Sequence, residues 1–384
     1  MIKSIIAQTN EIDEIDLAVV SILAQLELNQ NLLANSFALI FGQFDSFAPG
    51  LLPAIAQTLP FDIIGVSAPM TTSQLSKSDY SLLTLVVLTS DDMVFSVGIS
   101  ESMDIDPQTQ VNELISRLMT GQSQSPKLGF LLGPPSVHPV QADHVVAYFT
   151  KALPNCPFFG TLSCDFNIQE MPRYVFFNGE CYTNRFSLVL FFGLIKPKFN
   201  LISLPEKKAL KHRAIISKVQ GNILMEVNGI NFMDYLRDLG VSGDIRQSYL
   251  TMPFLVTEPN GKSKIHMLIS QTDEGYAVCT QDIILNSTLG LSGFDETDVL
   301  LSARRLTEEL KWEQFDFCLI LSCLGRNIGL GLNYLAELDM FRAGLGDMLP
   351  YVVLYSGGEF CPEINDNGES INSFHNLVLA SCRF

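Results

Sequence analysis

Residues 349–359 read LPYVVLYSGGE, an apolar run that a Leu-Pro pair introduces and a turn of small residues closes. The same order occurs at residues 59–69 (LPFDIIGVSAP) and at residues 153–165 (LPNCPFFGTLSCD). Because proline cannot continue a helix, each pair indicates the end of a helix and the entry into a strand. Runs as apolar as these are typical of strands that are buried on both faces. The repetition predicts three copies of one structural unit.

Each Leu-Pro pair is preceded by an amphipathic segment and, before that, by another apolar run. The earlier runs are FALIFGQF at 37–44, LGFLLGPPS at 128–136 and FDFCLILSC at 315–323. In the third copy, apolar residues at helical spacing fill the interval: Leu332, Leu335, Leu338, Phe341 and Leu345. Strands that alternate with helices predict βαβ units with right-handed crossovers. We expect an α/β fold in which repeated βαβ-type units form mixed sheets covered by helices.

The boundary between two domains is expected in the stretch Lys196–Lys218, which holds seven of the 24 basic residues and two prolines. Such a composition indicates a solvated linker, or alternatively a docking patch for an acidic partner. The predicted domains are residues 1–200, with two repeats, and residues 201–384, with the third.

Composition excludes several classes of protein. With 47% hydrophobic residues, the chain can build a substantial core, and 24 basic against 41 acidic residues give a net charge of −17. This charge disfavours nucleic acids and anionic membranes as partners. No segment approaches the ~18–20 apolar residues of a membrane span. Eight cysteines without a CxxC motif give no support for structural zinc or c-type haem, so we expect a cytoplasmic protein with reduced thiols.

Three polar clusters fall at the ends of apolar strands near the C-terminus. They are Ser322–Arg326 (SCLGR), Tyr355–Glu359 (YSGGE) and His375-Asn376. In open α/β sheets, ligands bind beyond the carboxyl ends of the strands. The predicted ligand-binding residues are Cys323, Arg326, Tyr355, Gly358, Glu359, His375 and Asn376.

The three clusters, in this order, resemble the C-terminal domain of the FIST family, and Val227-Asn228-Gly229 resembles the opening of that domain. The first two repeats, above all LPFDIIGVSAP, resemble the N-terminal FIST domain. One departure is Val353, at a place where the family usually has glycine. The resemblance implies a bacterial intracellular sensor, not an enzyme, that binds a small ligand such as an amino acid or another small carboxylate. It also implies a separate output protein.

Some stand-alone members of the family are haem proteins that sense nitric oxide and regulate a histidine kinase, and the resemblance implies this subgroup as the closest comparison. Haem b needs an axial ligand, commonly a neutral histidine. The chain has five histidines. His138, in a loop after the strand of the second repeat, is the first candidate, and His144, at the start of the next helix, is the second. His212 and His266 are weaker candidates.

Two alternatives stay open for the predicted site. Arg326 could bind a carboxylate with both arms of its guanidinium, or it could form an internal salt bridge with Glu359 or another acid. Cys323 could be an inert buried thiol, or it could act with His375 in a thiol-dependent enzyme. Polar residues at successive strand ends argue against a purely structural scaffold.

Overall fold

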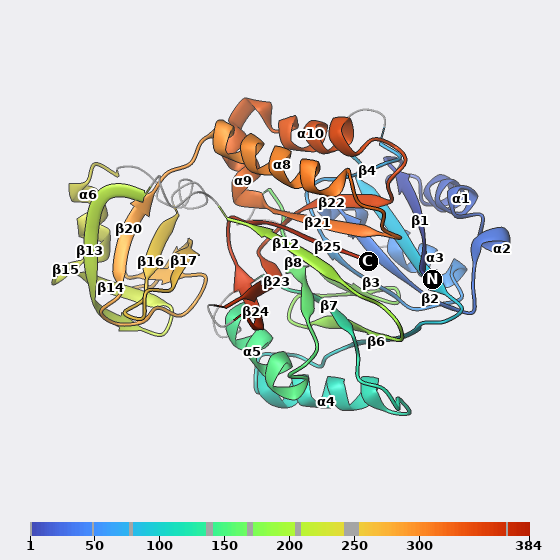
Figure 1. The fold of residues 1–384 in the computed structure, drawn as a ribbon, viewed down its shortest axis with the longest axis horizontal. Coiled ribbons are helices and arrows are strands. Elements are labelled where there is room, and N and C mark those ends of the chain that lie inside the picture. Colours follow the sequence, from blue (N-terminus) through green and yellow to red (C-terminus); the bar gives the residue numbers. More distant parts are fainter. Residues whose placement is uncertain are drawn as a thin grey trace.

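A computed structural model describes residues 2–47, 50–76, 80–135, 141–166, 172–203, 209–241, 253–365 and 368–384. The chain forms a layered α/β body and a smaller, mainly β part, residues 209–292, here named the β insert, which lies at one end of the body (Figure 1).

The three repeats are confirmed, and each has the same strand pairing. In each, two parallel strands joined by a helix are followed by a third strand that pairs antiparallel with the first. The first repeat contains β2 (Asn35–Gly42), α3 (Leu51–Thr58), β3 (Ile63–Ser67) and β5 (Leu83–Ser90). The second contains β7 (Leu128–Gly133), α5 (Ala142–Ala152), β8 (Phe158–Leu162) and β11 (Ser187–Phe192). The third contains β21 (Cys318–Cys323), α10 (Ala336–Leu345), β22 (Tyr351–Ser356) and β25 (Leu379–Arg383).

Each repeat also begins with a strand and a helix, so the units are larger than the Leu-Pro pattern indicates. The opening strand pairs antiparallel with the last strand of its own unit. These pairs of elements are β1 (Ile2–Thr9) with α1 (Ile15–Leu26), β6 (Val94–Ile99) with α4 (Pro107–Met119), and β12 (Lys198–Ile202) with α8 (Glu296–Leu310). Asp106 caps the N-terminus of α4: its side chain accepts a hydrogen bond from the Thr109 amide.

The units exchange strands in a cycle. A short strand that leaves the first unit, β4 (Thr71–Ser73), pairs with β22 of the third. The corresponding strand of the third unit, β23 (Glu359–Ile364), pairs with β8 of the second, and β9 of the second (Val175–Phe177) pairs with β3 of the first. Hairpins extend two of these sheets with β10 (Glu180–Tyr182) and β24 (Ser370–His375). The three units therefore form one body that no single unit completes.

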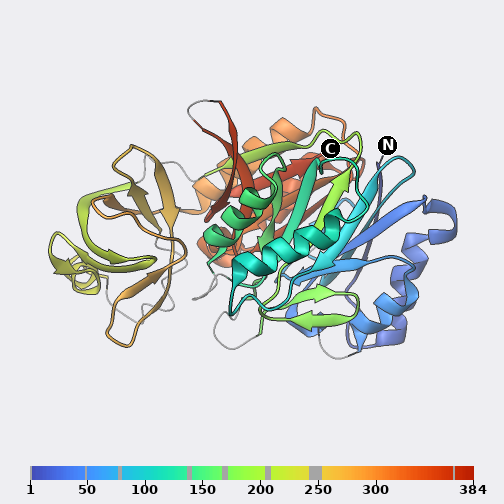
Figure 2. The ribbon, with the colours of Figure 1, turned by 90° about the horizontal axis from the view of Figure 1, so that it is seen from below.

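The three sheets enclose a shared core, and the helices cover their outer faces (Figure 2). Alternate residues of each strand point inward, for example Phe37, Phe130 and Leu319. The opposite faces pack against α1 and α3 in the first unit, α4 and α5 in the second, and α8 and α10 in the third. These strands thus bury both faces, as their continuous apolar sequences predict.

The β insert interrupts the third unit between β12 and α8. Its sheet curls until the end strands, β17 and β18, are joined in the chain through Met267. It has a hydrophobic core of its own, which includes Ile216, Phe254 and Leu289. Its elements are β13 (Ala209–Gln220), β14 (Ile223–Val227), β15 (Ile230–Asn231), α6 (Phe232–Asp238), β16 (Phe254–Thr257), β17 (Ser263–His266), β18 (Leu268–Gln271), β19 (Ala277–Cys279) and β20 (Thr288–Ser292).

Two local predictions from the sequence are wrong. Residues Lys196–Lys218 are not a plain linker, because β12 and most of β13 lie in this stretch. Leu332 is not on the buried face of the third crossover helix: α10 begins at Ala336, and Leu332 is 98% exposed. The division at residue 200 stays a prediction. Among the described residues, no helix is both long and apolar enough to cross a membrane.

Val353 occupies the position that Gly65 and Gly160 hold in the other repeats. Each of these residues pairs with the middle of the preceding parallel strand, at Ile320, Ile40 and Leu131 respectively. A Cβ atom at Gly65 would lie 2.0 Å from the Ile40 carbonyl oxygen. Val353, in contrast, packs fully buried in the core beneath α10. The close backbone approach of the first two copies is therefore absent at Val353.

Candidate functional site

A small cleft separates the β insert from the third unit, and it contains two of the residues predicted from the sequence, His375 and Asn376. Its volume is about 90 Å³. Its polar or charged lining residues are Ser203, Ser263, Lys264, Gln281, Glu363, His375 and Asn376. Lys264 and Gln281 belong to the insert, whereas His375 and Asn376 end the β23–β24 hairpin of the body. The site exists only where the two parts meet.

His375 is held as a neutral ring at the floor of this cleft. Its Nε2 atom lies 3.0 Å from the carbonyl oxygen of Cys361, so Nε2 carries the proton and Nδ1 is the acceptor. Burial lowers the pKa of His375, and the hydrogen bond to Cys361 only partly opposes this effect. A neutral imidazole with a free acceptor can receive a hydrogen bond from a ligand.

The charges of the cleft are unequal. Glu363 is already engaged, because its Oε1 atom accepts hydrogen bonds from Lys262 Nζ and Ser373 Oγ, each at 2.8 Å. Burial raises the pKa of Glu363, but these partners outweigh burial and leave the pKa below its usual value. Lys264 is half-buried, and no carboxylate among the described residues forms an ion pair with it. The cleft therefore offers one uncompensated positive charge.

Asn376 joins the cleft to the insert. Its Nδ2 atom donates to the carbonyl oxygen of Ile265 over 3.4 Å, a long and weak hydrogen bond. The next residue, Leu377, is wholly buried and has a φ angle of 55°. This left-handed conformation is uncommon for a bulky side chain.

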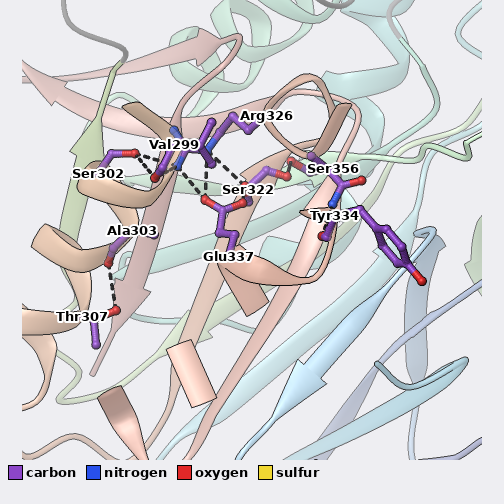
Figure 3. Close-up of polar contacts among 10 residues, drawn as sticks. Val299, Ser302, Ala303, Thr307, Ser322, Arg326, Tyr334, Glu337 and Ser356 are labelled. Atoms are coloured by element: carbon purple, nitrogen blue, oxygen red, sulfur yellow. Dashed lines mark hydrogen bonds and ion pairs between the residues drawn. The ribbon is translucent and has the colours of Figure 1, made fainter. Parts of the chain in front are cut away.

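Arg326 does not line the cleft, and its side chain points towards Glu337 and Ser302 instead (Figure 3). Its side chain is wholly buried, and its Nη2 atom donates to Glu337 Oε1 at 2.6 Å and to Ser302 Oγ at 2.7 Å. Ser322 donates to the other oxygen of Glu337 at 2.7 Å. The internal ion pair expected for Arg326 thus exists, but its partner is Glu337, not Glu359. The pair joins α9 (Leu324–Leu330), α10 and, through Ser302, α8.

Glu359 and Cys323 form a second buried group. Glu359 Oε1 accepts a hydrogen bond from Ser356, and burial raises the pKa of Glu359 well above its usual value, although Ser356, Arg326 and Cys323 oppose this effect. Burial and the neighbouring Glu359 likewise raise the pKa of Cys323. A thiol held neutral is a poor nucleophile. The Nε2 atom of His375 donates its hydrogen bond to the backbone carbonyl of Cys361. The structure therefore gives no support to a catalytic pair of Cys323 and His375.

Tyr355 and Gly358 have packing roles. Tyr355 is wholly buried in the core beneath α10, where burial raises its pKa well above the usual value. Gly358 lies against Phe374, since a Cβ atom at Gly358 would be 2.5 Å from that ring. The seven predicted residues therefore separate into a cleft pair, His375 and Asn376, and a buried group.

Two family models match the chain. The FIST N domain matches residues 36–230, and the FIST C domain matches residues 232–362. The chain belongs to the FIST family. A search of curated proteins finds no match. FIST domains are sensory domains of signalling proteins that bind small ligands. The junction between the two matches falls inside the β insert, at β15. The cleft of this FIST protein takes Ser203 from the first matched region and Lys264 from the second, whereas Glu363, His375 and Asn376 follow the second match in the chain.

Haem, which the resemblance implies for one FIST subgroup, does not fit the described residues. His144 is paired, since its Nε2 atom lies 2.8 Å from Asp282 Oδ2. The cleft is far smaller than the roughly 300–1,000 Å³ typical of pockets for drug-sized ligands. Two larger surface hollows, of about 560 and 350 Å³, have no histidine, cysteine or methionine in their linings. His138 lies outside the described residues, so haem ligation by His138 stays a prediction.

Sequence reasoning missed the residues that the β insert and the hairpin contribute to the cleft: Lys264, Gln281 and Glu363. The sequence around His266 predicts a strand, and β17 (Ser263–His266) is that strand. Nothing in the local sequence indicates that this strand faces Asn376. The missed partner of Arg326, Glu337, lies in the first turn of α10, where an acidic residue also suits the helix dipole.

Proposed function

We propose that this FIST protein senses a small carboxylate, of the size of a short amino acid, in the cleft between the β insert and the third unit. The observation that carries the proposal is Lys264, a half-buried cation without a carboxylate partner among the described residues, in a cleft lined by hydrogen-bonding groups. Lys264 would pair with the carboxylate, and His375 and Asn376 would orient it. A charge-assisted hydrogen bond of this kind is stronger than a neutral one.

The size of the cleft supports a ligand of few atoms. A volume of about 90 Å³ leaves no room for a macrocycle. Glu363 lies at the same cleft with its charge shared by Lys262, so an ammonium group on the ligand would find a weaker partner than a carboxylate does. Simple carboxylates and small amino acids are therefore both candidates, and binding data separate them.

The test is calorimetric titration with acetate, glycine and alanine. We expect at least one of them to bind wild-type protein and to bind Lys264→Met about tenfold or more weakly, because the charged partner is lost. Lys218→Met is the matched control, because Lys218 pairs with Glu226 on the insert at 3.6 Å, within the insert's own β13–β14 pair. The proposal fails if no carboxylate binds, or if Lys264→Met and Lys218→Met bind equally well.

We also propose that the signal passes to a separate protein such as a histidine kinase, which the family resemblance supports. The net charge of −17 would steer the protein towards a basic surface, and salt would weaken this steering. Autophosphorylation of a candidate kinase, with apo and carboxylate-saturated protein at several salt concentrations, tests the proposal. A kinase activity that ignores the ligand at every salt concentration would contradict it.

A further inference from the structure

The β insert has the properties of a part that moves as one body. It has its own hydrophobic core, and the chain enters and leaves it once each, between β12 and α8. Parts of a chain that share only a small apolar interface are expected to move relative to one another. The question is what holds the insert against the body.

The apolar contact between the two parts is small. We name it the seat: Ile265 and Met267 of the insert pack against Cys323 and Leu377 of the body, with Phe294 from the connection to α8. Cys323 is only 7% exposed in this arrangement. Three residues of the seat are buried, against 15 in the core of the insert, so the seat is the smallest apolar cluster among the described residues.

Polar contacts at two further places also fix the insert to the body. At one place Lys262 Nζ lies 2.8 Å from Glu363 Oε1 of the hairpin. At the other, Asp282 pairs with His144 of α5 at 2.8 Å, and its amide donates to Asp143 Oδ2 at 3.1 Å. These polar contacts are partly exposed, and exposed contacts of this kind each contribute little to stability. Contacts of this kind can hold a closed state without making it permanent.

The cleft lies within this same boundary. Lys264 lies between Lys262 and the seat residue Ile265 in the sequence, and the Ile265 carbonyl accepts from Asn376. Any ligand that touches both Lys264 and His375 therefore bridges the two parts. A ligand that binds only one of two states shifts the equilibrium towards that state.

We infer that the β insert is a hinged clamp. It closes on the body through the seat and through two polar contacts, Lys262–Glu363 and Asp282–His144, which we name the latches. A ligand in the cleft favours the closed state. The inference rests on the proposed function only for what fills the cleft. Lifting of the insert would uncover Cys323, and the movement of the insert would be the signal that an output protein detects. Domain closure around a ligand is a common mode of switching.

The native cysteines test the clamp. N-ethylmaleimide labelling of Cys323, followed by mass spectrometry of its peptide, reports lifting of the insert, whereas Cys279 in the core of the insert reports unfolding of the insert itself. We expect Lys262→Gln to speed Cys323 labelling about twofold to fivefold and to leave Cys279 unchanged, because one latch is lost. Lys218→Gln, which breaks an ion pair within the insert, should change neither.

Adding Asp282→Asn to Lys262→Gln also weakens the second latch, because the carboxylate that faces His144 is lost while the backbone hydrogen bond to Asp143 stays, and we expect the accelerations to multiply. The clamp is overturned if Cys323 is labelled at the same rate in the Lys262→Gln and Lys218→Gln variants. It is also overturned if labelling of Cys279 accelerates together with labelling of Cys323. A second arm repeats the labelling of wild-type protein in saturating acetate or glycine, which should slow labelling of Cys323. If the latch variants accelerate labelling and neither carboxylate slows it, the clamp stands and the small-carboxylate proposal fails.

Discussion

The Arg326 guanidinium and the Glu337 carboxylate lie 2.6 Å apart, and both side chains are wholly buried. Burying a charge is costly unless it is paired and hydrogen-bonded, and here Ser302 and Ser322 supply the additional hydrogen bonds. The pair connects three helices that cover the third sheet. Arg326 in the conspicuous SCLGR sequence therefore serves the architecture of the third unit and does not line the cleft.

Arg326→Met is expected to lower the free energy of unfolding by about 3–5 kcal/mol, because Glu337 would remain buried without its partner. Chemical denaturation at neutral pH measures the change. Arg305→Met is the control: Arg305 pairs with Glu309 at 3.1 Å but is 70% exposed, so its loss should cost under about 1 kcal/mol. Equal effects of the two substitutions would contradict a structural role for the buried pair.

The sequence was informative where structure is local and repeated. Leu59, Leu153 and Leu349, each followed by proline, end three crossover segments in the structure as the pattern predicts. The exchange of strands between units was not predictable. β4 pairs with β22 across more than 270 residues, and a strand of only three residues, Thr71–Ser73, carries no sequence signal for a distant partner. The cleft was missed in part for the same reason: Lys264 and His375 meet only through the placement of the β insert.

Stability should fall as pH rises because of Glu359. Burial raises its pKa in the folded protein well above the usual 4.5, so the folded state holds a proton that the unfolded state releases. Between pH 4.5 and the raised pKa, the unfolded state binds fewer protons, and stability therefore decreases with increasing pH. Glu359→Gln should remove this component. We expect the variant to gain stability relative to wild type at pH 8 compared with pH 5, in denaturant titrations at both values.

Glu313 is a useful reference in the same titrations. Hydrogen bonds from Arg383 and Lys198 lower the pKa of Glu313 to about 2, so its contribution has the opposite sign and is lost as pH falls below 4.5. A difference between Glu359→Gln and wild type that grows towards acid would therefore contradict the assignment to Glu359.

Glycine at positions 65 and 160 is expected to be required by the close approach of the parallel strands. A Cβ atom at Gly160 would lie 1.8 Å from the Leu131 carbonyl oxygen, and one at Gly65 would meet Ile40 at 2.0 Å. Either alanine substitution should destabilise the protein by about 1–3 kcal/mol or more, because backbone must shift. Gly293→Ala, which meets no atom within 4 Å, should change stability by about 0.5 kcal/mol or less.

Haem ligation by His138 predicts a specific pattern of variants. Titration with hemin should give a Soret band that His138→Ala abolishes or shifts. His144→Ala should leave the band unchanged, because the His144 ring already pairs with Asp282. His375→Ala should alter stability more than the spectrum, since its Nε2 proton is committed to Cys361. A full-intensity, unshifted band in the His138 variant would transfer the ligand assignment to His144 or another residue.

At position 377, the usual order of stability, in which an alanine variant is more stable than a glycine variant, should be lost or reversed. Its φ angle of 55° is one that an L-residue with a Cβ atom adopts at a cost of roughly 1–2 kcal/mol and that glycine adopts freely. Leu377→Ala loses the buried side chain, at about 2–5 kcal/mol, and keeps the backbone strain. Leu377→Gly loses one methyl group more and relieves the strain, so it should be as stable as Leu377→Ala or about 1 kcal/mol more stable. Val378, the next residue, is not among the residues with a positive φ angle and provides the contrast: Val378→Gly should be less stable than Val378→Ala, as is normal for residues outside the left-handed region. Thermal or chemical unfolding of the four variants decides, and a Leu377→Gly protein clearly less stable than Leu377→Ala would show that the left-handed leucine stores no strain.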